Sequence, residues 1–192
     1  MLQVPTRRPR AEASEAILDA AMHLFAQRPP HSVSVREIAA EAGVNHALVH
    51  RYFGSKDALL GAVLQHATRQ GADVVDHARD ARDAVAAVFR LRSSGEPYTP
   101  ALARALLDGA DPRALQDEFP IMTRLVELVR ADRDARTVDA ELDARVAVAA
   151  VAALLLGWQL FEPFLLAATG MPDVDRDTLD DRLVALASRL VE

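Results

Sequence analysis

The chain has 192 residues, of which 51% are hydrophobic, and a net charge of −6. This length and apolar content suffice for one or two domains with a buried core. The absence of cysteine excludes disulfides and thiolate metal sites, and it fits a reducing cytoplasm. Residues 1–11 are polar and basic and precede no apolar segment of signal-peptide length, so we expect a cytoplasmic protein.

Charge is distributed unevenly along the chain. Residues 1–60 carry seven basic and six acidic side chains, whereas the remainder carries fifteen and twenty-two. Charges interact over about 8 to 10 Å at physiological salt, so an acidic region does not cancel the field of a basic surface held away from it. The basic segment 6–10 either contacts a nucleic acid, in a minor groove or along phosphates, or remains unstructured.

After a first helix over about residues 13–28, the stretch 34–56 predicts two short helices and a tight turn. Ser34 is an N-cap residue, and Glu37 three positions later completes a capping box. Gly43 ends this helix through a left-handed turn, and Asn45 caps the next one. The arrangement indicates a helix-turn-helix, in which the second helix enters a DNA groove.

The second of these helices has an inward and an outward face. Each residue turns a helix by about 100°, so Val49 and Phe53 point inward while Ala47 and Arg51 point outward. Lys56 follows in the first turn of the next helix, where exposed N–H groups favour an anion, so we expect it to contact a phosphate. The expected DNA-binding residues are Ser34, Arg36, Asn45, His46, Ala47, Leu48, His50, Arg51, Tyr52 and Lys56.

These motifs resemble the TetR family of transcriptional regulators. Residues 34–39 read SVREIA, residues 42–45 read AGVN, and residues 49–59 read VHRYFGSKDAL, close to the family pattern TVxxIA, AGVS and LYxYFxSKExL. The upstream helix carries the family's ILxAAxxLF arrangement at residues 17–25. One departure is His50, which replaces the usual tyrosine that contacts the DNA backbone.

The resemblance implies an all-α fold, with a three-helix DNA-binding head at residues 11–58 and a helical effector-binding and dimerisation body at residues 59–192. It further implies a homodimeric repressor, released from its operator when a small molecule enters the body and moves the long helix after Lys56. In this family the last two long helices pair with those of a second subunit. Four leucines supply a matching seam, although packing within one subunit gives the same pattern: Leu179, Leu183, Leu186 and Leu190.

Beyond the head, the pattern predicts helices over about 55–79, 83–93, 101–107, 120–131, 142–161 and 178–191, with breaks at Gly109 and Pro112. Large side chains in an Ala-, Leu- and Val-rich body suit a mainly apolar effector, although each would also fill an ordinary core. The candidate effector residues are Phe89, Phe119, Met122, Trp158 and Phe161.

Other readings are less favoured. Segment 146–168 is apolar enough to suggest a membrane span, but Gln159, Glu162 and Pro163 interrupt it, so we expect a core helix and no membrane partner. His46 and His50 are spaced as metal ligands, yet no third ligand lies nearby, and we expect neither a metal nor a cofactor. No catalytic motif is present. The alternative to a regulator is an all-helical ligand-binding or cofactor-dependent enzyme without DNA binding.

Overall fold

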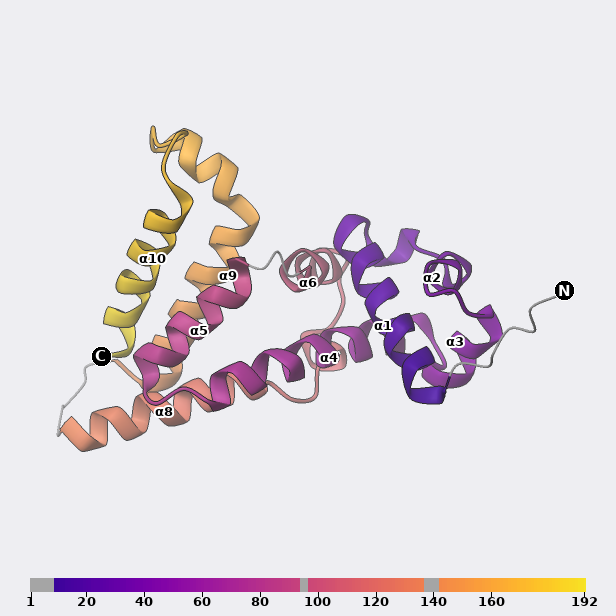
Figure 1. Ribbon diagram of the computed structural model, residues 1–192, viewed down its shortest axis with the longest axis horizontal. Helices are drawn as coiled ribbons and strands as arrows, with labels where there is room; N and C mark the ends of the chain where they lie inside the picture. The colour runs from indigo at the N-terminus through magenta and orange to yellow at the C-terminus, as the bar shows by residue number, and fades with distance from the viewer. Residues whose placement is uncertain (1–8, 94–96, 137–141) are drawn as a thin grey trace, which may run out of the picture. The chain divides into compact units, whose positions relative to one another are not determined.

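The computed structural model describes residues 9–93, 97–136 and 142–192. These residues form α-helices and one short 3-10 helix, with no strand among them, so the expected all-α fold is confirmed (Figure 1). The elements are α1 (Arg10–Gln27), η1 (Pro30–Ser32), α2 (Val35–Glu41), α3 (His46–Phe53), α4 (Lys56–Asp76), α5 (Ala81–Ser93), α6 (Tyr98–Leu107), α7 (Pro112–Leu115), α8 (Pro120–Arg136), α9 (Ala144–Ala168) and α10 (Arg176–Val191).

The chain divides into two compact units. The first comprises the chain up to Ala67 together with Pro100–Glu118, and the second comprises Thr68–Thr99 and Phe119–Glu192. Helices α4 and α6 each contribute residues to both units. These compact units do not coincide with the expected head at 11–58 and body at 59–192. The part of α4 up to Ala67 belongs to the first unit, and so does the later segment Pro100–Glu118.

In the first unit, α1, α2 and α3 pack around a small apolar core (Figure 1). The apolar side chains of α1 recur every four residues and therefore lie on one face of the helix. The largest side chains of this core are fully buried: Ile17, Phe25, Val33, Ile38, Leu59, Val63 and Leu64. This core fixes the directions of the short helices, which are too short to be stable alone.

Residues 100–118 complete the first unit. The side-chain amide of Gln116 donates to the carbonyl of Leu64 at 3.3 Å, and His31 Nδ1 lies 2.9 Å from Asp108 Oδ2. A Cβ added to Gly61 would lie 3.1 Å from the carbonyl oxygen of Leu115, so this glycine permits close packing of α7 on α4. The expected break at Pro112 is instead the start of α7.

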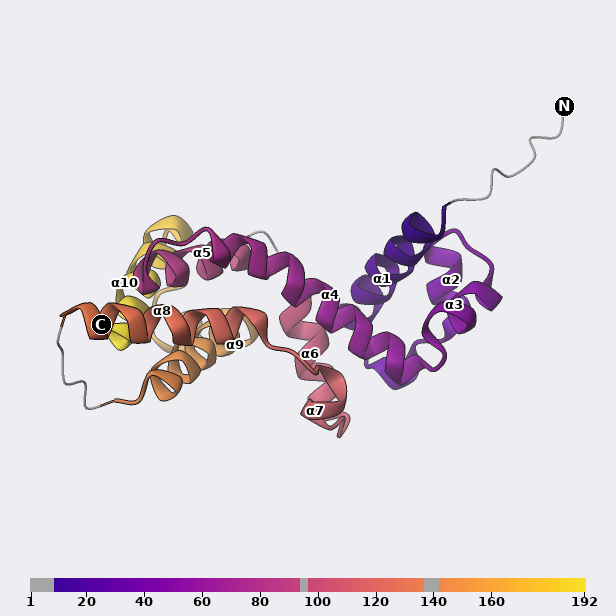
Figure 2. The ribbon, with the colours of Figure 1, turned by 90° about the horizontal axis from the view of Figure 1, so that it is seen from below.

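The second unit is a bundle in which α10 packs on α5 and α9, and α8 packs on α5 and α9 (Figure 2). Its core is formed by buried apolar side chains from each of these helices, among them Val85, Phe89, Leu125, Val129, Val148, Val151, Leu155, Leu179 and Leu183. A Cβ added to Gly71 of α4 would lie 2.8 Å from Cδ1 of Ile121, so the glycine allows α8 to approach α4 closely.

Helix boundaries differ from the sequence expectation in several places. Helix α4 ends at Asp76 rather than near residue 79, and α8 continues to Arg136 rather than 131. Helix α9 runs through Pro163 without ending. A proline inside a helix removes one backbone hydrogen bond and usually kinks or ends the helix, so α9 continues here with one bond fewer.

Candidate DNA-binding surface

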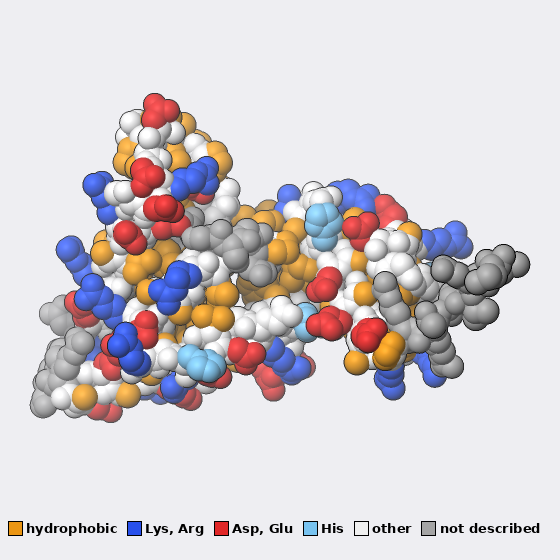
Figure 3. Space-filling view, in the orientation of Figure 1, with side chains coloured by type: hydrophobic (Ala, Val, Ile, Leu, Met, Phe, Trp, Pro, Cys, Tyr) orange, Lys and Arg blue, Asp and Glu red, His pale blue; other side chains and the backbone are white. Residues whose placement is uncertain are grey.

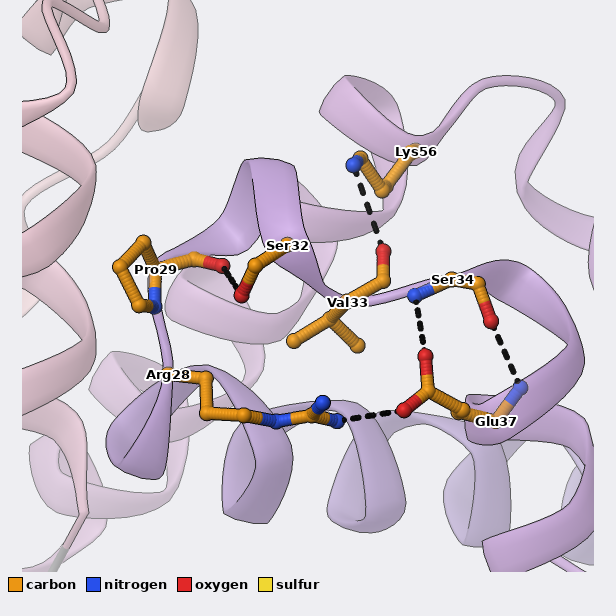
Figure 4. Close-up of polar contacts among 7 residues, drawn as sticks. All are labelled: Arg28, Pro29, Ser32, Val33, Ser34, Glu37 and Lys56. Atoms are coloured by element: carbon orange, nitrogen blue, oxygen red, sulfur yellow. Dashed lines mark hydrogen bonds and ion pairs between the residues drawn. The ribbon is translucent and has the colours of Figure 1, made fainter.

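A network of polar contacts fixes the start of α2 (Figure 4). The backbone N–H of Ser34 donates to Glu37 Oε2 at 2.8 Å, and the N–H of Glu37 donates to Ser34 Oγ at 3.2 Å, which completes the capping box. Arg28, at the C-terminal end of α1, donates to Glu37 Oε1 at 2.8 Å. The hydrogen bond from the Ser34 N–H, followed by that from Arg28, lowers the pKa of Glu37 to about 2. The expected roles of Ser34 as the N-cap and of Glu37 as its partner in the capping box are confirmed.

Lys56 is held by the backbone that leads into α2. Its ammonium donates to the carbonyl oxygens of His31 at 3.2 Å and of Val33 at 3.3 Å, the latter drawn in Figure 4. An ammonium has three N–H donors, so two are engaged inside the protein and one is left for a phosphate. Phosphate contact by Lys56 stays a prediction, and the residue has a structural role that its position in the motif did not indicate.

Helix α3 has defined ends that set its direction. Asn45 Oδ1 accepts from the N–H of Ala47 at 2.9 Å, which confirms Asn45 as the N-cap. At the other end Gly54 has φ of 74° and its N–H donates to the carbonyl of His50 at 2.9 Å. Between α2 and α3, Gly43 has φ of 65°, as the left-handed turn requires. The helix-turn-helix geometry thus follows from residues at its ends.

The outward face of α3 carries unoccupied donors. Ala47 and Arg51 are exposed and Val49 is buried, as expected, whereas Phe53 is half-buried rather than fully inward. The side chains of His46 and Arg51, and of Arg36 on α2, are exposed and make no hydrogen bond or ion pair with any residue in the described ranges. These donors are free to contact base edges or phosphates.

His50 differs from its neighbours because its ring has a partner. The Nδ1–H donates to the carbonyl of Gly54 at 3.1 Å, so the neutral ring keeps its other nitrogen, Nε2, as an acceptor. Protonation would turn Nε2 into a second donor without breaking the bond to Gly54. The side chain is exposed, so Nε2 can reach an anion.

Tyr52 and Leu48 are half-buried at the edges of this surface. The Tyr52 ring packs edge-on against Phe53, with centroids 6.5 Å apart, and the guanidinium carbon of Arg10 lies 5.5 Å from the Tyr52 centroid. Sequence reasoning placed Arg10 only in an unpatterned basic arm. No local periodicity relates Arg10 to Tyr52, so the sequence offers no signal for their contact. The contact of Arg28 with Glu37 was not predicted for the same reason.

The five candidate effector residues do not share one environment. Phe89 is buried in the core of the second unit, and Met122 and Trp158 are partly buried against that core. Phe119 and Phe161 are instead exposed, by 47% and 57%. The assignment of these five residues to an effector site stays a prediction. The indole Nε1 of Trp158 is buried and has no hydrogen-bond partner in the described part of the chain.

The four leucines of α10 are divided as well. Leu179 and Leu183 are buried in the core of their own unit, Leu190 packs against it, and Leu186 is 50% exposed. Packing within one subunit thus accounts for most of this pattern. Exposed apolar side chains instead lie along α9, at Val146, Leu160, Phe161 and Phe164.

Neither a metal cluster nor a large single-sign surface is evident. Within the described residues, no group of three or more His, Asp or Glu side chains is arranged to hold a metal, and this includes the surroundings of His46 and His50. Figure 3 shows basic and acidic side chains interspersed on the visible face of both units. On that face, neither sign of charge gathers into one large patch.

Two short helices joined by a tight turn, with exposed donors on the second, define a helix-turn-helix DNA-binding protein. Residues 17–63 match the model of the bacterial regulatory proteins of the tetR family. The chain is 39% identical over 192 residues to the HTH-type transcriptional repressor Rv3405c of Mycobacterium tuberculosis. This alignment covers 95% of this chain and 91% of the relative. The chain belongs to the TetR family, and it is a DNA-binding transcriptional regulator.

Solved structures share the fold. A transcriptional regulator, SCO4942, from Streptomyces coelicolor has a TM-score of 0.71 at 21% identity, covering 92% of this chain and 96% of the other. The regulator FadR from Bacillus subtilis, solved in complex with stearoyl-CoA, has a TM-score of 0.67 at 18% identity, covering 92% and 95%. At these identities the likeness concerns the fold alone.

Proposed function

We propose that this protein is a homodimeric repressor in the cytoplasm, which binds a palindromic operator and leaves it when a small molecule binds. The observation that carries the proposal is the outward face of α3, where His46 and Arg51 have no partner within the described chain, on a helix fixed at both ends. Repression is supported by the relative from Mycobacterium tuberculosis, which is named a repressor. The proposed DNA-contacting residues remain those expected from the sequence.

The experiment is enrichment of a binding site from random DNA on the purified protein. A dimer with one recognition helix per subunit should select a roughly palindromic site, with half-site centres about 34 Å apart. Affinity should fall steeply with salt, because basic side chains displace counterions from phosphates. Recovery of no site from any pool, or binding that does not change with salt, would overturn the proposal.

The dimer surface is proposed on α9 rather than on the leucines of α10. Positions 146, 150, 153, 157, 160 and 164 are spaced alternately by four and three residues, as in helices that pair along an apolar seam. Phe164 is 68% exposed, and nothing lies within 4 Å of a Cβ added to Gly157, so the centre of this face is open to a close partner. An apolar face of this kind is covered in a soluble protein by another surface.

A second copy suits this face better than a lipid bilayer does. By length and composition α9 is apolar enough to cross a membrane. However, its opposite side is packed in the core of its own unit through Val148, Val151 and Leu155. Near its end Glu162, whose side chain is only 15% exposed, lies 3.4 Å from Arg176 of α10. A helix bound to its own bundle on one side and carrying an ion pair does not span a bilayer without unfolding that bundle.

The effector is proposed to be mainly apolar and to bind in the second unit beside Trp158. FadR from Bacillus subtilis was solved with stearoyl-CoA, a molecule with a long apolar chain. A buried donor without a partner is costly, and an oxygen acceptor on an otherwise apolar molecule would satisfy the Nε1–H of Trp158. Release of DNA requires that the effector bind the DNA-incompetent state better, by about 2.7 kcal/mol for a hundredfold loss of affinity.

A screen of apolar and amphipathic compounds tests this part. Trp158 is the only tryptophan, so quenching of its emission reports binding nearby. An effector at the proposed site should quench Trp158 and release the operator, and Trp158→Phe should weaken both its binding and its effect. A compound that releases DNA without changing the emission of Trp158 would place the site elsewhere. Failure of a broad screen would indicate a repressor without a small-molecule effector.

The enzyme alternative is not favoured. The relatives that match this chain over nearly its whole length are named transcriptional regulators. The described residues hold no cluster of titratable side chains arranged for metal binding. We therefore propose no catalytic activity.

A further inference from the structure

Arg10 lies against the recognition helix although it is distant from it in sequence. It is the first residue of α1, and its guanidinium carbon is 5.5 Å from the centroid of the Tyr52 ring in the last turn of α3. Tyr52 is itself held by the edge-on contact with Phe53. The contact brings an arginine beside the surface that carries the exposed donors of α3.

The stability of α1 does not explain an arginine at this position. A helix N-terminus carries partial positive charge, so a cation in the first turn is unfavourable there. The N-cap residue, Pro9, provides no side-chain hydrogen bond that would offset this. Arg10 also forms no ion pair with an acidic side chain in the described ranges. A residue that is unfavourable for the helix that contains it, and that gains no compensating contact within that helix, often has a role in binding.

The geometry of the contact leaves Arg10 able to bind an anion. The Arg10 side chain is exposed and makes no hydrogen bond in the described ranges, so its five N–H groups remain available. The attraction to an aromatic ring uses no hydrogen bond, and the planar fork of a guanidinium can donate two parallel hydrogen bonds to a phosphate. Arg7 and Arg8 precede it in the sequence and add positive charge to the same end of the chain.

We propose that Arg10 binds a backbone phosphate of the operator beside the major groove that α3 enters, and that Tyr52 is the positioning residue for Arg10. This proposal rests on the proposed DNA-binding function and adds to it a contact made from outside the helix-turn-helix motif. The partner is double-stranded DNA, recognised through its phosphate and not through its base edges. Tyr52 acts on Arg10 through its ring.

The test uses the full chain, with the enriched operator and a 40-base-pair duplex of random sequence as probes. Arg10→Ala should weaken binding to both probes by about tenfold or more and should lower the slope of log affinity against log salt by about one for each subunit. Arg10→Lys keeps the charge but not the planar fork, so it should recover the salt slope more than the affinity. Arg82→Ala, which removes an exposed arginine from α5, is the matched control and should bind as the parent does.

Tyr52 variants separate positioning from a direct contact. Tyr52→Leu should weaken binding only when Arg10 is present, so the double variant should be no weaker than Arg10→Ala. Circular dichroism and thermal melting of each variant establish that the fold is kept.

Two results would overturn the inference. They are parental affinity in Arg10→Ala, and full additivity of the Arg10 and Tyr52 effects. If the parent binds neither probe, the proposed function itself is wrong, which is a different outcome from parental binding that is insensitive to Arg10.

Discussion

Arg28 and Glu37 form an ion pair 2.8 Å long that joins the end of α1 to the first turn of α2. The same carboxylate accepts the N–H of Ser34 through its other oxygen at 2.8 Å. One side chain therefore fixes both the start of α2 and the angle at which α2 meets α1. The orientation of α3, which packs on α1 and α2, depends on this junction.

The first prediction concerns acid stability. Hydrogen bonds from the Ser34 N–H and from Arg28 lower the pKa of Glu37 to about 2 from an ordinary value of 4.5. A carboxyl whose pKa is lowered by folding stabilises the folded state fully at any pH above its ordinary pKa. This stabilisation is lost as the pH falls through the lower pKa of the folded state. Glu37→Gln should therefore lower the melting temperature at pH 7. The decrease should be only a few degrees, because an exposed ion pair contributes little to stability.

The difference in melting temperature between parent and Glu37→Gln should narrow as pH falls from about 4.5 to about 2. Glu41→Gln is the matched control, because it changes the same type of side chain on the same helix, where that side chain is exposed and makes no hydrogen bond or ion pair in the described residues. A difference that stays constant across this pH range would show that the charge of Glu37 does not stabilise the junction.

The second prediction separates phosphate contacts from base contacts. Lys56→Ala should weaken binding to every DNA sequence and flatten the salt dependence, because a phosphate contact carries no base preference. Arg36→Ala, or a change at His46, should alter base preference by about 1 to 3 kcal/mol for each lost bidentate contact. Competition between the enriched site and single-base variants of it measures both effects.

The structure adds a requirement to the Lys56 experiment. Lys56 also donates to the carbonyls of His31 and Val33, so its removal should lower the melting temperature in the absence of DNA. Lys56→Arg keeps the charge and serves as the comparison. If Lys56→Ala reduces stability but leaves the salt slope unchanged, its role is confined to holding the turn before α2.

The ends of the short helices could be predicted from sequence because the signals are local. Ser34 and Glu37 are three residues apart, and Asn45 and Gly43 flank one turn, so each interaction is contained in the stretch that encodes it. The partners of Lys56 could not be predicted in this way. They are backbone carbonyls more than twenty residues upstream, and a carbonyl has no sequence signature.

The body was harder to predict because its composition is uniform. Leu183 and Leu186 look alike in sequence, and only the packing of α10 on α5 and α9 decides that the first is buried and the second exposed. Both faces of α9 are apolar, so its periodicity does not reveal which side packs on its own unit. At α7, Pro112 alone indicates a break, but Asp111 before it accepts from the N–H of Arg113 and makes the pair a helix start.

The third prediction uses the histidines of the recognition helix. A phosphate near an imidazole favours its protonated form, and imidazoles exchange protons near neutral pH. His50 already donates from Nδ1 to Gly54, so protonation at Nε2 adds a donor for DNA and breaks no contact. Operator affinity should therefore rise as pH falls from about 8 to 6.

A His46→Gln, His50→Gln double variant should lose most of this pH dependence, measured by fluorescence anisotropy at constant ionic strength. His77→Gln, on an exposed residue just after α4, is the control, because it removes an imidazole outside the helix-turn-helix. Unchanged pH dependence in the double variant would assign the effect to other groups.

The last prediction concerns the dimer. If the exposed face of α9 pairs with that of a second copy, a charge placed on this face would be buried without a partner, which is costly. Leu160→Glu with Phe164→Glu should therefore yield folded monomers that bind the palindromic operator at least about a hundredfold more weakly, because each head then binds alone. Leu107→Glu is the matched control, since Leu107 of α6 is 88% exposed and lies outside this face.

Sedimentation measures the oligomeric state of each variant at micromolar concentration, and circular dichroism confirms the helical fold. A parent that is monomeric under these conditions, or a double variant that remains dimeric, would remove the α9 face from the interface. Flotation of the parent with anionic lipid vesicles, abolished by the same two substitutions, would assign this face to a membrane instead. In the dimer, the same face is covered by protein, so the parent should not float with vesicles and its dimer should persist in their presence.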